Sequence, residues 1–185
     1  MEKKKNIVVL TGSPRKEGNS ELLADAFIRG AITGGHKITK YQAGKKKIGN
    51  CIACNNCYTK GSACIFDDDF NELAPLLESA DMIVLATPLY WFAFPAQIKA
   101  ALDKMYALMV GKRNIKGKES VLLVCAETDD TSDFDGIVRS YELINRYLGW
   151  ENRGILCVPN VNNTGDILHT NALPEAEELA NRVAS

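Results

Sequence analysis

Four cysteines that lie close together carry the most distinctive chemistry in the chain. They are separated by two, two and six residues and are Cys51, Cys54, Cys57 and Cys64. Four thiolates at such short spacing can surround one metal centre, and the CxxCxxC pattern is more typical of an iron–sulfur cluster than of zinc. Free or redox-active thiols are the third interpretation. The two other cysteines, Cys125 and Cys157, lie in apolar runs and are expected to be buried.

A loop rich in glycine and hydroxyl groups, Thr11 to Ser20, reads TGSPRKEGNS and lies between an apolar run and a helical pattern. Such a loop aims unpaired backbone N–H groups and the positive end of the helix dipole at one space, which suits an anion. The loop contains neither G-x-G-x-x-G nor the Lys-Ser/Thr pair of a P-loop, which disfavours a Rossmann dehydrogenase and a P-loop ATPase. Its hydroxyl groups favour a terminal phosphate. The alternative is a plain Gly/Ser/Pro turn followed by a capped helix. In either case we expect Ser20 with Glu21 to cap the first helix.

The segment Thr87 to Pro95, TPLYWFAFP, follows another apolar run and holds four aromatic residues. Packing against the next helix is one interpretation. In a sheet of strand order 2-1-3-4-5, however, the loops after the first and third strands face each other at the topological switch point, where open α/β folds bind ligands. Stacking of an aromatic side chain on a flat ring adds about 0.5–1.5 kcal/mol beyond area burial. The two loops together predict a site for a mononucleotide with a large flat base.

Short apolar runs without polar alternation predict strands that are buried on both faces. They are Asn6 to Leu10, Ile38 to Tyr41, Met82 to Ala86, Val121 to Cys125 and Ile155 to Val158. Segments with helical spacing alternate with them and are Ser20 to Ala31, Phe70 to Ser79, Pro95 to Met109, Phe134 to Leu148 and Leu173 to Val183. This βα alternation predicts a doubly wound three-layer sandwich with a five-stranded parallel sheet of order 2-1-3-4-5. Lys99 and Lys104 share the third helix with apolar neighbours and are expected to face solvent.

Two stretches, Gln42 to Phe66 and Pro159 to Thr170, exceed the usual loop length, and long loops in compact domains are often functional. The first holds the four clustered cysteines. No repeat or shift in composition marks a second domain. We therefore expect one domain over residues 1–185, with a Cys-rich insertion at about residues 43–66.

The two ligand loops resemble those of the NAD(P)H-dependent FMN reductase branch of the flavodoxin-like superfamily. The resemblance covers nearly the whole chain and rests on GSPR at 12–15, GNS at 18–20, TPLYW at 87–91 and PAQIKA at 95–100. It implies a flavodoxin-like sandwich that binds the FMN phosphate through Ser13, Arg15, Gly18, Asn19 and Ser20. The residues implied to flank the isoalloxazine ring are Pro88, Leu89, Tyr90, Trp91 and Phe92. Glu127 and Thr128, after the fourth strand, would complete the site, and an acidic solvated turn is the alternative there.

The cysteine spacing resembles that of the iron–sulfur flavoproteins, relatives that carry a four-iron cluster on the loop after the second strand. Reductases with a similar loop, ending like GSAC at 61–64 and DDD at 67–69, need not hold a cluster. Cluster, zinc and free thiols therefore all remain open.

The resemblance implies an FMN-dependent oxidoreductase that takes hydride from NADH or NADPH and passes electrons to a small-molecule acceptor such as a flavin or quinone. No side chain need act as a catalytic acid or base, because the flavin carries the chemistry. The alternative is an iron–sulfur flavoprotein that carries electrons with a [4Fe-4S] cluster on the four cysteines, and a regulatory flavodoxin-like protein is a third possibility. A homodimer or homotetramer is implied, because a partner subunit commonly completes the flavin face in this family.

Composition restricts the partners and the compartment. The net charge of -1 and the pI near 6.1 lack the basic excess that binding a nucleic-acid backbone usually needs. The apolar run Ile7 to Leu10 is too short for a signal peptide, and no segment is long enough for a membrane helix. We therefore expect a cytoplasmic protein that does not bind nucleic acid or membranes and whose cysteines form no disulfides.

Overall fold

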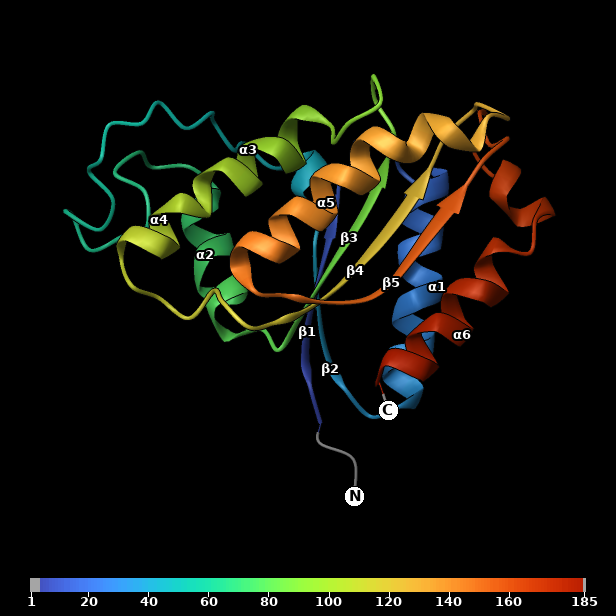
Figure 1. Cartoon of the computed structure of the whole chain (residues 1–185), viewed down its shortest axis with the longest axis horizontal. Helices are drawn as coiled ribbons and strands as arrows, with labels where there is room; N and C mark the ends of the chain where they lie inside the picture. Colours follow the sequence, from blue (N-terminus) through green and yellow to red (C-terminus); the bar gives the residue numbers. More distant parts are fainter. Residues whose placement is uncertain (1–3, 185) are drawn as a thin grey trace.

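A computed structural model describes residues 4–184 of the chain, and its centre is one parallel sheet with strand order β2-β1-β3-β4-β5 (Figure 1). The strands are β1 (Asn6–Thr11), β2 (Lys37–Tyr41), β3 (Met82–Pro88), β4 (Glu119–Cys125) and β5 (Glu151–Val158). The three central strands are almost fully buried because helices cover both faces, which explains their unbroken runs of Val, Ile and Leu. The predicted fold class and strand order are confirmed.

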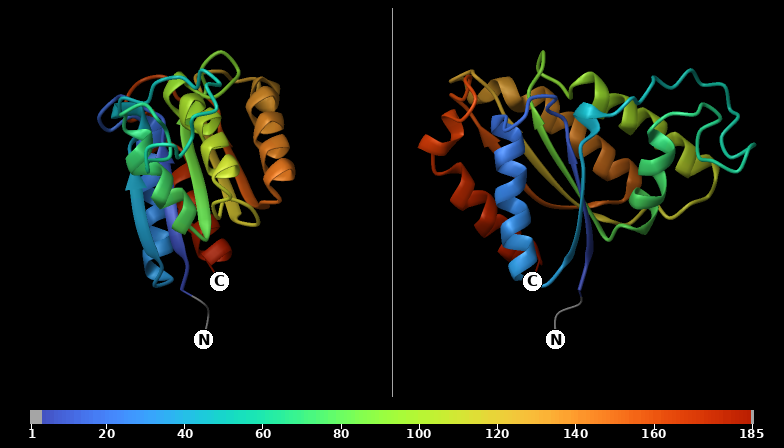
Figure 2. Two further views of the ribbon diagram at one scale, coloured as in Figure 1. Left: turned by 90° about the vertical axis from the view of Figure 1, so that its left-hand side faces the viewer. Right: turned by 180° about the vertical axis from the view of Figure 1, so that it is seen from behind.

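Helices form the two outer layers of the sandwich (Figure 2). One face of the sheet is covered by α1 (Asn19–Thr33) and α6 (Ala172–Ala184), which pack against each other. The other face is covered by α2 (Phe70–Ser79), α3 (Ala96–Lys104), α4 (Tyr106–Val110) and α5 (Asp135–Leu148). Short 3-10 turns lie in the connections and are η1 (Ala43–Lys45), η2 (Thr131–Phe134) and η3 (Asp166–His169).

Parallel register places the carboxyl ends of the strands at one edge of the sheet. Thr11 at the end of β1 lies beside Ala86 of β3, and Pro88 at the end of β3 lies beside Cys125 at the end of β4. The loops that follow β1, β3 and β4 therefore meet at this edge. The four-cysteine segment leaves the sheet after β2 and projects to one side, beyond the end of α3 (Figure 1).

Several predicted element boundaries differ from those in the structure. The helix predicted over Pro95 to Met109 is divided at Met105, whose N–H bonds both Ala101 O and Leu102 O and so tightens the turn. Strand β5 begins at Glu151, earlier than predicted, because its polar first residues pair with β4 at an exposed edge. Helix α1 begins at Asn19 after Gly18, with no side-chain cap, so the predicted capping by Ser20 is wrong.

Lys104 also differs from its prediction. Lys99 is exposed and pairs with Asp103, as an outward-facing lysine would, but only 3% of the Lys104 side chain is exposed. The Lys104 ammonium instead forms a buried ion pair with Asp68. No helix within residues 4–184 is both long and apolar enough to span a membrane.

Candidate functional site

A large cleft lies at the carboxyl edge of the sheet, between the loops after β1, β3 and β4. Its volume is about 660 Å³, within the range of sites for cofactors of nucleotide size. All twelve residues that the sequence predicts to bind the cofactor line this cleft. The structure therefore brings together Ser13, Arg15, Gly18, Asn19, Ser20, Pro88, Leu89, Tyr90, Trp91, Phe92, Glu127 and Thr128.

The loop from Thr11 to Ser20 leads into the N-terminus of α1, a helix of 15 residues. Ser20, in the first turn of α1, is 1% exposed, and its Oγ has no hydrogen-bond partner among the described residues. A buried hydroxyl without a partner is costly, and here it borders a cleft at the positive end of a helix dipole. This end of the cleft therefore suits a phosphate group.

The backbone at the start of this loop packs tightly against the side chains of Thr87 and Ile98. A Cβ atom on Gly12 would lie 2.5 Å from Thr87 Oγ1 and 2.9 Å from Ile98 Cδ1. Only glycine lets the loop approach the end of β3 this closely. Ser13 Oγ accepts a hydrogen bond from the N–H of Arg15 at 3.1 Å and so shapes the loop. The Arg15 side chain is exposed and forms no ion pair within residues 4–184, which leaves its guanidinium available to an anion.

Asn19 has a second role that its residue type alone does not indicate. Its Nδ2 donates to Asn163 O at 2.9 Å, and its Oδ1 accepts from the N–H groups of Gly165 and Ile167 at 3.1 and 3.3 Å. The side chain thus fastens the loop after β5 to the end of the Thr11–Ser20 loop. Its backbone N–H still lies at the start of α1, so contact with a phosphate through the backbone is compatible with this role.

The aromatic loop ends in a strained two-residue turn. Tyr90 and Ala93 exchange backbone hydrogen bonds at 3.2 and 3.1 Å, and the residues between them, Trp91 and Phe92, have φ angles of 48° and 61°. Such a turn strongly favours Asn-Gly, and bulky residues in this conformation cost of the order of 1–3 kcal/mol each. Trp91 is also 92% exposed. The fold thus holds large aromatic rings at the rim of the cleft against their backbone preference, as functional sites often do.

The double change Trp91→Asn, Phe92→Gly tests this interpretation. Relief of backbone strain should raise the free energy of unfolding by about 1–3 kcal/mol, measured by urea denaturation without cofactor. Loss of the rings should weaken FMN binding about tenfold, measured by titration. A variant that is less stable and binds FMN unchanged would contradict the proposed role of the turn.

The loop after β4 is more ordered than a solvated acidic turn. Thr128 Oγ1 donates to Asp133 at 2.6 Å and accepts from the N–H of Asp130 at 3.1 Å. Thr128 O also accepts from the N–H of Asn160 at 2.9 Å, which ties this loop to the loop after β5. Glu127 is exposed at the cleft.

Sequence reasoning missed five residues that line the cleft, which are Cys125, Ala126, Asp133, Val161 and Asn162. The unusual length of Pro159 to Thr170 was the available signal for the last two. Burial raises the pKa of the Cys125 thiol to about 12; the nearby Ser20 hydroxyl opposes this effect, although its geometry does not make a hydrogen bond with the thiol. Cys125 is therefore a neutral thiol at physiological pH and not a nucleophile.

The four clustered cysteines gather around a second, small cavity on the projecting segment. Burial raises the pKa of Cys57, and the nearby thiols of Cys54, Cys64 and Cys51 raise it further, so the four groups are close enough to interact. Within residues 4–184, however, no three potential ligands converge in metal-binding geometry. The donor set suits a thiolate-bound metal centre, and the side chains would have to close around it.

The backbone of the cysteine segment is unusual as well. Ala53, Asn55 and Tyr58 have φ angles of 53°, 54° and 61°, and each adjoins Cys54 or Cys57. Non-glycine residues in this left-handed region are strained, and strain of this kind clusters at ligand sites.

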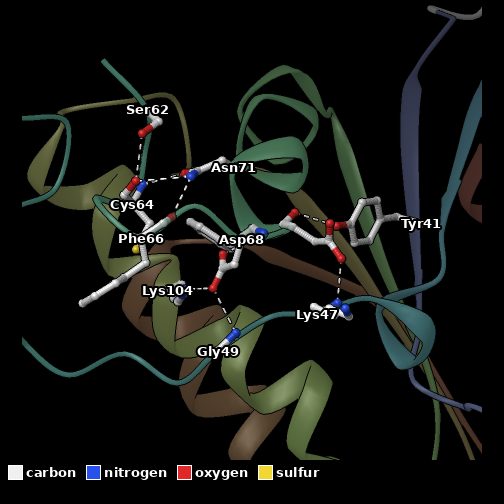
Figure 3. A network of polar contacts seen from close by, with 11 residues as sticks. Tyr41, Lys47, Gly49, Ser62, Cys64, Phe66, Asp68, Asn71 and Lys104 are labelled. Atoms are coloured by element: carbon white, nitrogen blue, oxygen red, sulfur yellow. Dashed lines mark hydrogen bonds and ion pairs between the residues drawn. The ribbon is translucent and has the colours of Figure 1, made fainter. Parts of the chain in front are cut away.

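A polar network joins the two ends of the cysteine segment (Figure 3). The Asp68 carboxylate accepts from the N–H groups of Gly49 at 2.9 Å and Phe70 at 3.0 Å and pairs with Lys104. Asp69 Oδ2 accepts from the N–H of Lys47 at 2.6 Å, and the Tyr41 hydroxyl donates to Asp69 O. These contacts hold the chain before Cys51 against the chain after Cys64.

Asp68→Asn should destabilise the protein by about 3 kcal/mol at pH 7, because it leaves the buried Lys104 charge without its partner. Burial alone would raise the pKa of Asp68, but the bonds from Lys104, Gly49 and Phe70 outweigh burial and hold the pKa below its ordinary value. The stabilisation is therefore complete above the ordinary aspartate pKa and is lost as the pH falls through the lower folded value. Urea unfolding should show a large difference from wild type at pH 7 that shrinks near pH 3. A constant difference would be inconsistent with this ion pair.

A five-stranded parallel sheet of this order, with the Thr11–Ser20 loop and the aromatic loop at its switch point, defines a flavodoxin-like fold. The family of NADPH-dependent FMN reductases matches residues 5–132, and the chain belongs to this family.

Among curated relatives, an iron–sulfur flavoprotein of Archaeoglobus fulgidus is 38% identical over 112 residues, 60% of this chain and 50% of the relative. The iron–sulfur flavoprotein MJ1083 of Methanocaldococcus jannaschii is 31% identical over 105 residues, 57% of this chain and 54% of the relative. The chain thus spans about half the length of these relatives. The structure of an NAD(P)H:quinone oxidoreductase from Methanothermobacter marburgensis superposes with a TM-score of 0.75 at 17% identity, covering 97% of this chain and 96% of that one, which supports the fold.

Proposed function

We propose that the protein is an FMN-dependent oxidoreductase that takes hydride from NAD(P)H and passes the electrons to a small-molecule acceptor such as a flavin or quinone. The observation that carries the proposal is the unpartnered Ser20 hydroxyl at the N-terminus of α1, facing the cleft that the aromatic turn borders. Membership of the FMN reductase family supports it.

Different residues of the cleft would bind different parts of FMN. Ser20, the backbone of Gly18 and Asn19, the loop shaped by Ser13, and the guanidinium of Arg15 would hold the phosphate. Pro88 to Phe92 would flank the ring system, and Glu127 and Thr128 would close the side after β4. Ser20, Gly18 and Asn19 lie at the start of α1, so their backbone amides and the Ser20 hydroxyl would position the phosphate with little reorganisation.

Bound FMN supplies the two-electron chemistry, and the chain contributes positioning and electrostatics. No side chain of the cleft is required as a general acid or base. The Cys125 thiol, with its pKa raised to about 12, stays protonated and does not compete as a nucleophile.

Anaerobic titration tests the proposal. The protein loaded with FMN should lose its flavin absorption band on addition of NADPH or NADH and regain it when a quinone is added. The variant Glu178→Gln, on the exposed face of α6, is a matched control that should behave as wild type. A flavin band that neither nicotinamide bleaches would overturn the oxidoreductase assignment.

A second candidate function is that of an iron–sulfur flavoprotein electron carrier. The specific observation that favours it is the gathering of four cysteines around one small cavity on a strained loop. The curated relatives named iron–sulfur flavoproteins add support. The residues that would hold a [4Fe-4S] cluster are Cys51, Cys54, Cys57 and Cys64, and such a cluster would supply one-electron transfer.

We further propose that the protein works as a homodimer or homotetramer. Tyr90, Trp91 and Phe92 expose large aromatic surfaces beside the cleft, and apolar groups of this size often mark a protein interface. Light scattering of the protein with and without FMN would give the oligomeric state. The six unpaired cysteines fit a reducing compartment such as the cytoplasm.

A further inference from the structure

Cys64 is held by its backbone far more firmly than is usual in a segment without secondary structure. Its N–H donates to Asn71 Oδ1 at 2.7 Å. Its carbonyl oxygen accepts from Asn71 Nδ2 at 3.2 Å and from the Ser62 hydroxyl at 2.8 Å. The backbone N–H and C=O groups of Cys64 therefore both have hydrogen-bond partners, as they would in a strand. The Cys64 thiol forms none of these bonds.

Asn71 forms two of these three hydrogen bonds, and its side chain is therefore not used to cap its own helix. It lies in the first turn of α2, where a short polar side chain often bonds the helix backbone. Both ends of its amide instead face the incoming chain, and Nδ2 also donates to Phe66 O at 2.9 Å (Figure 3). The Asn71 amide acts here as acceptor through Oδ1 and as donor through Nδ2.

The hydrogen bonds between Asn71 and Cys64 lie next to the site formed by the four cysteines. Cys57 and Cys64 both line the small cavity, and both residues pack partly against the core beneath. Cys51, Cys54 and Cys57 lie on the strained stretch that leaves Gly49, which Asp68 fixes. Cys64 is the one clustered cysteine on the returning chain, so its distance from the other three depends on the anchor at α2.

We propose that Asn71 is a positioning residue for Cys64 and thereby for the four-cysteine site; its effect on a cluster rests on the second candidate function. By fixing the Cys64 backbone on the rigid start of α2, Asn71 directs the fourth thiol toward Cys57. The site is then partly assembled before a metal centre binds, and less ordering is needed on binding.

The variant Asn71→Leu keeps the approximate size of the side chain and removes its three hydrogen bonds. The matched control is Asn114→Leu, which removes one side-chain bond to the other end of α2, from Asn114 Nδ2 to Glu78 O at 3.3 Å. The first measurement uses reduced, metal-free protein, alkylated with iodoacetamide and digested with trypsin. Cleavage after Lys60 places Cys64 on a different peptide from Cys51, Cys54 and Cys57.

Asn71→Leu should raise the alkylation rate of Cys64 about tenfold, because hydrogen bonds that hold it half-buried are lost. The buried Cys125 serves as an internal reporter of unfolding, and its rate should not change. Asn114→Leu should leave both rates as in wild type. An unchanged Cys64 rate, or an equal rise at Cys125, would overturn the positioning role.

The second measurement addresses the metal centre with ferrous iron and sulfide as probes under anaerobic conditions. If wild type takes up iron, Asn71→Leu should lose that iron to a chelator about tenfold faster with unchanged FMN content. Equal rates of iron loss would overturn the proposal. If wild type takes up no iron, the second candidate function fails, and the Cys64 alkylation rate still decides the role of Asn71.

Discussion

Ser20→Asp should raise the Kd for FMN by about a hundredfold or more. The new carboxylate would lie in the first turn of α1, where the phosphate is proposed to bind, and two like charges about 4 Å apart near a protein surface repel by several kcal/mol. Quenching of FMN fluorescence on titration with protein measures the effect. Riboflavin, which lacks the phosphate, should bind the variant about as well as it binds wild type.

Two further variants make this result specific. Ser20→Ala removes the hydroxyl without adding charge and should weaken FMN binding by about tenfold at most. Asn181→Asp adds the same charge on the exposed surface of α6, outside the residues that line the cleft, and should have no effect. Equal FMN affinity in Ser20→Asp and wild type would place the phosphate elsewhere.

Cys54→Ser should abolish retention of a reconstituted iron–sulfur cluster while FMN binding stays unchanged. Cys54 is exposed, so this change removes a thiolate ligand with little effect on packing. Wild type reconstituted with iron and sulfide should hold about four iron atoms per chain, and a four-cysteine cluster deprived of one ligand is expected to be labile. Iron analysis and the absorption spectrum under anaerobic conditions measure the difference.

Cys157→Ser provides the matched control, since Cys157 lies on β5 and outside the clustered segment. It should keep both iron and FMN. Iron retention by Cys54→Ser equal to that of wild type would contradict the assignment of the four cysteines as ligands. One zinc ion per wild-type chain, in place of iron, would favour the zinc interpretation.

Much of the fold could be predicted because its signals are local. Uninterrupted short runs rich in Val, Ile and Leu, such as Ile7 to Leu10 and Met82 to Ala86, favour strands buried on both faces, and alternation with helical segments leaves few topologies. Boundaries that depend on tertiary pairing could not be predicted. The polar start of β5 is a strand only because Glu119 and Ser120 of β4 pair with it.

The cleft was predictable for the same reason, because loops after neighbouring parallel strands must meet at one edge. The role of Asn19 was not, since its partners Asn163 and Gly165 are more than 140 residues away in the chain. The strained turn at Trp91 and Phe92 could not be predicted from the sequence either, because their residue types disfavour that conformation. Lys104 was misassigned because only the three-dimensional structure places Asp68 beside it.

The ratio of riboflavin to FMN affinity tests the central claim most directly, since the two ligands share the ring system and differ by the phosphate. Titration of the cofactor-free protein with each ligand, followed by flavin fluorescence, gives both Kd values. Because α1 presents its N-terminus, the unpartnered Ser20 hydroxyl and Arg15 to the phosphate, FMN should bind about a hundredfold more tightly than riboflavin. Equal affinities, or no binding of FMN, would contradict the proposed cofactor site.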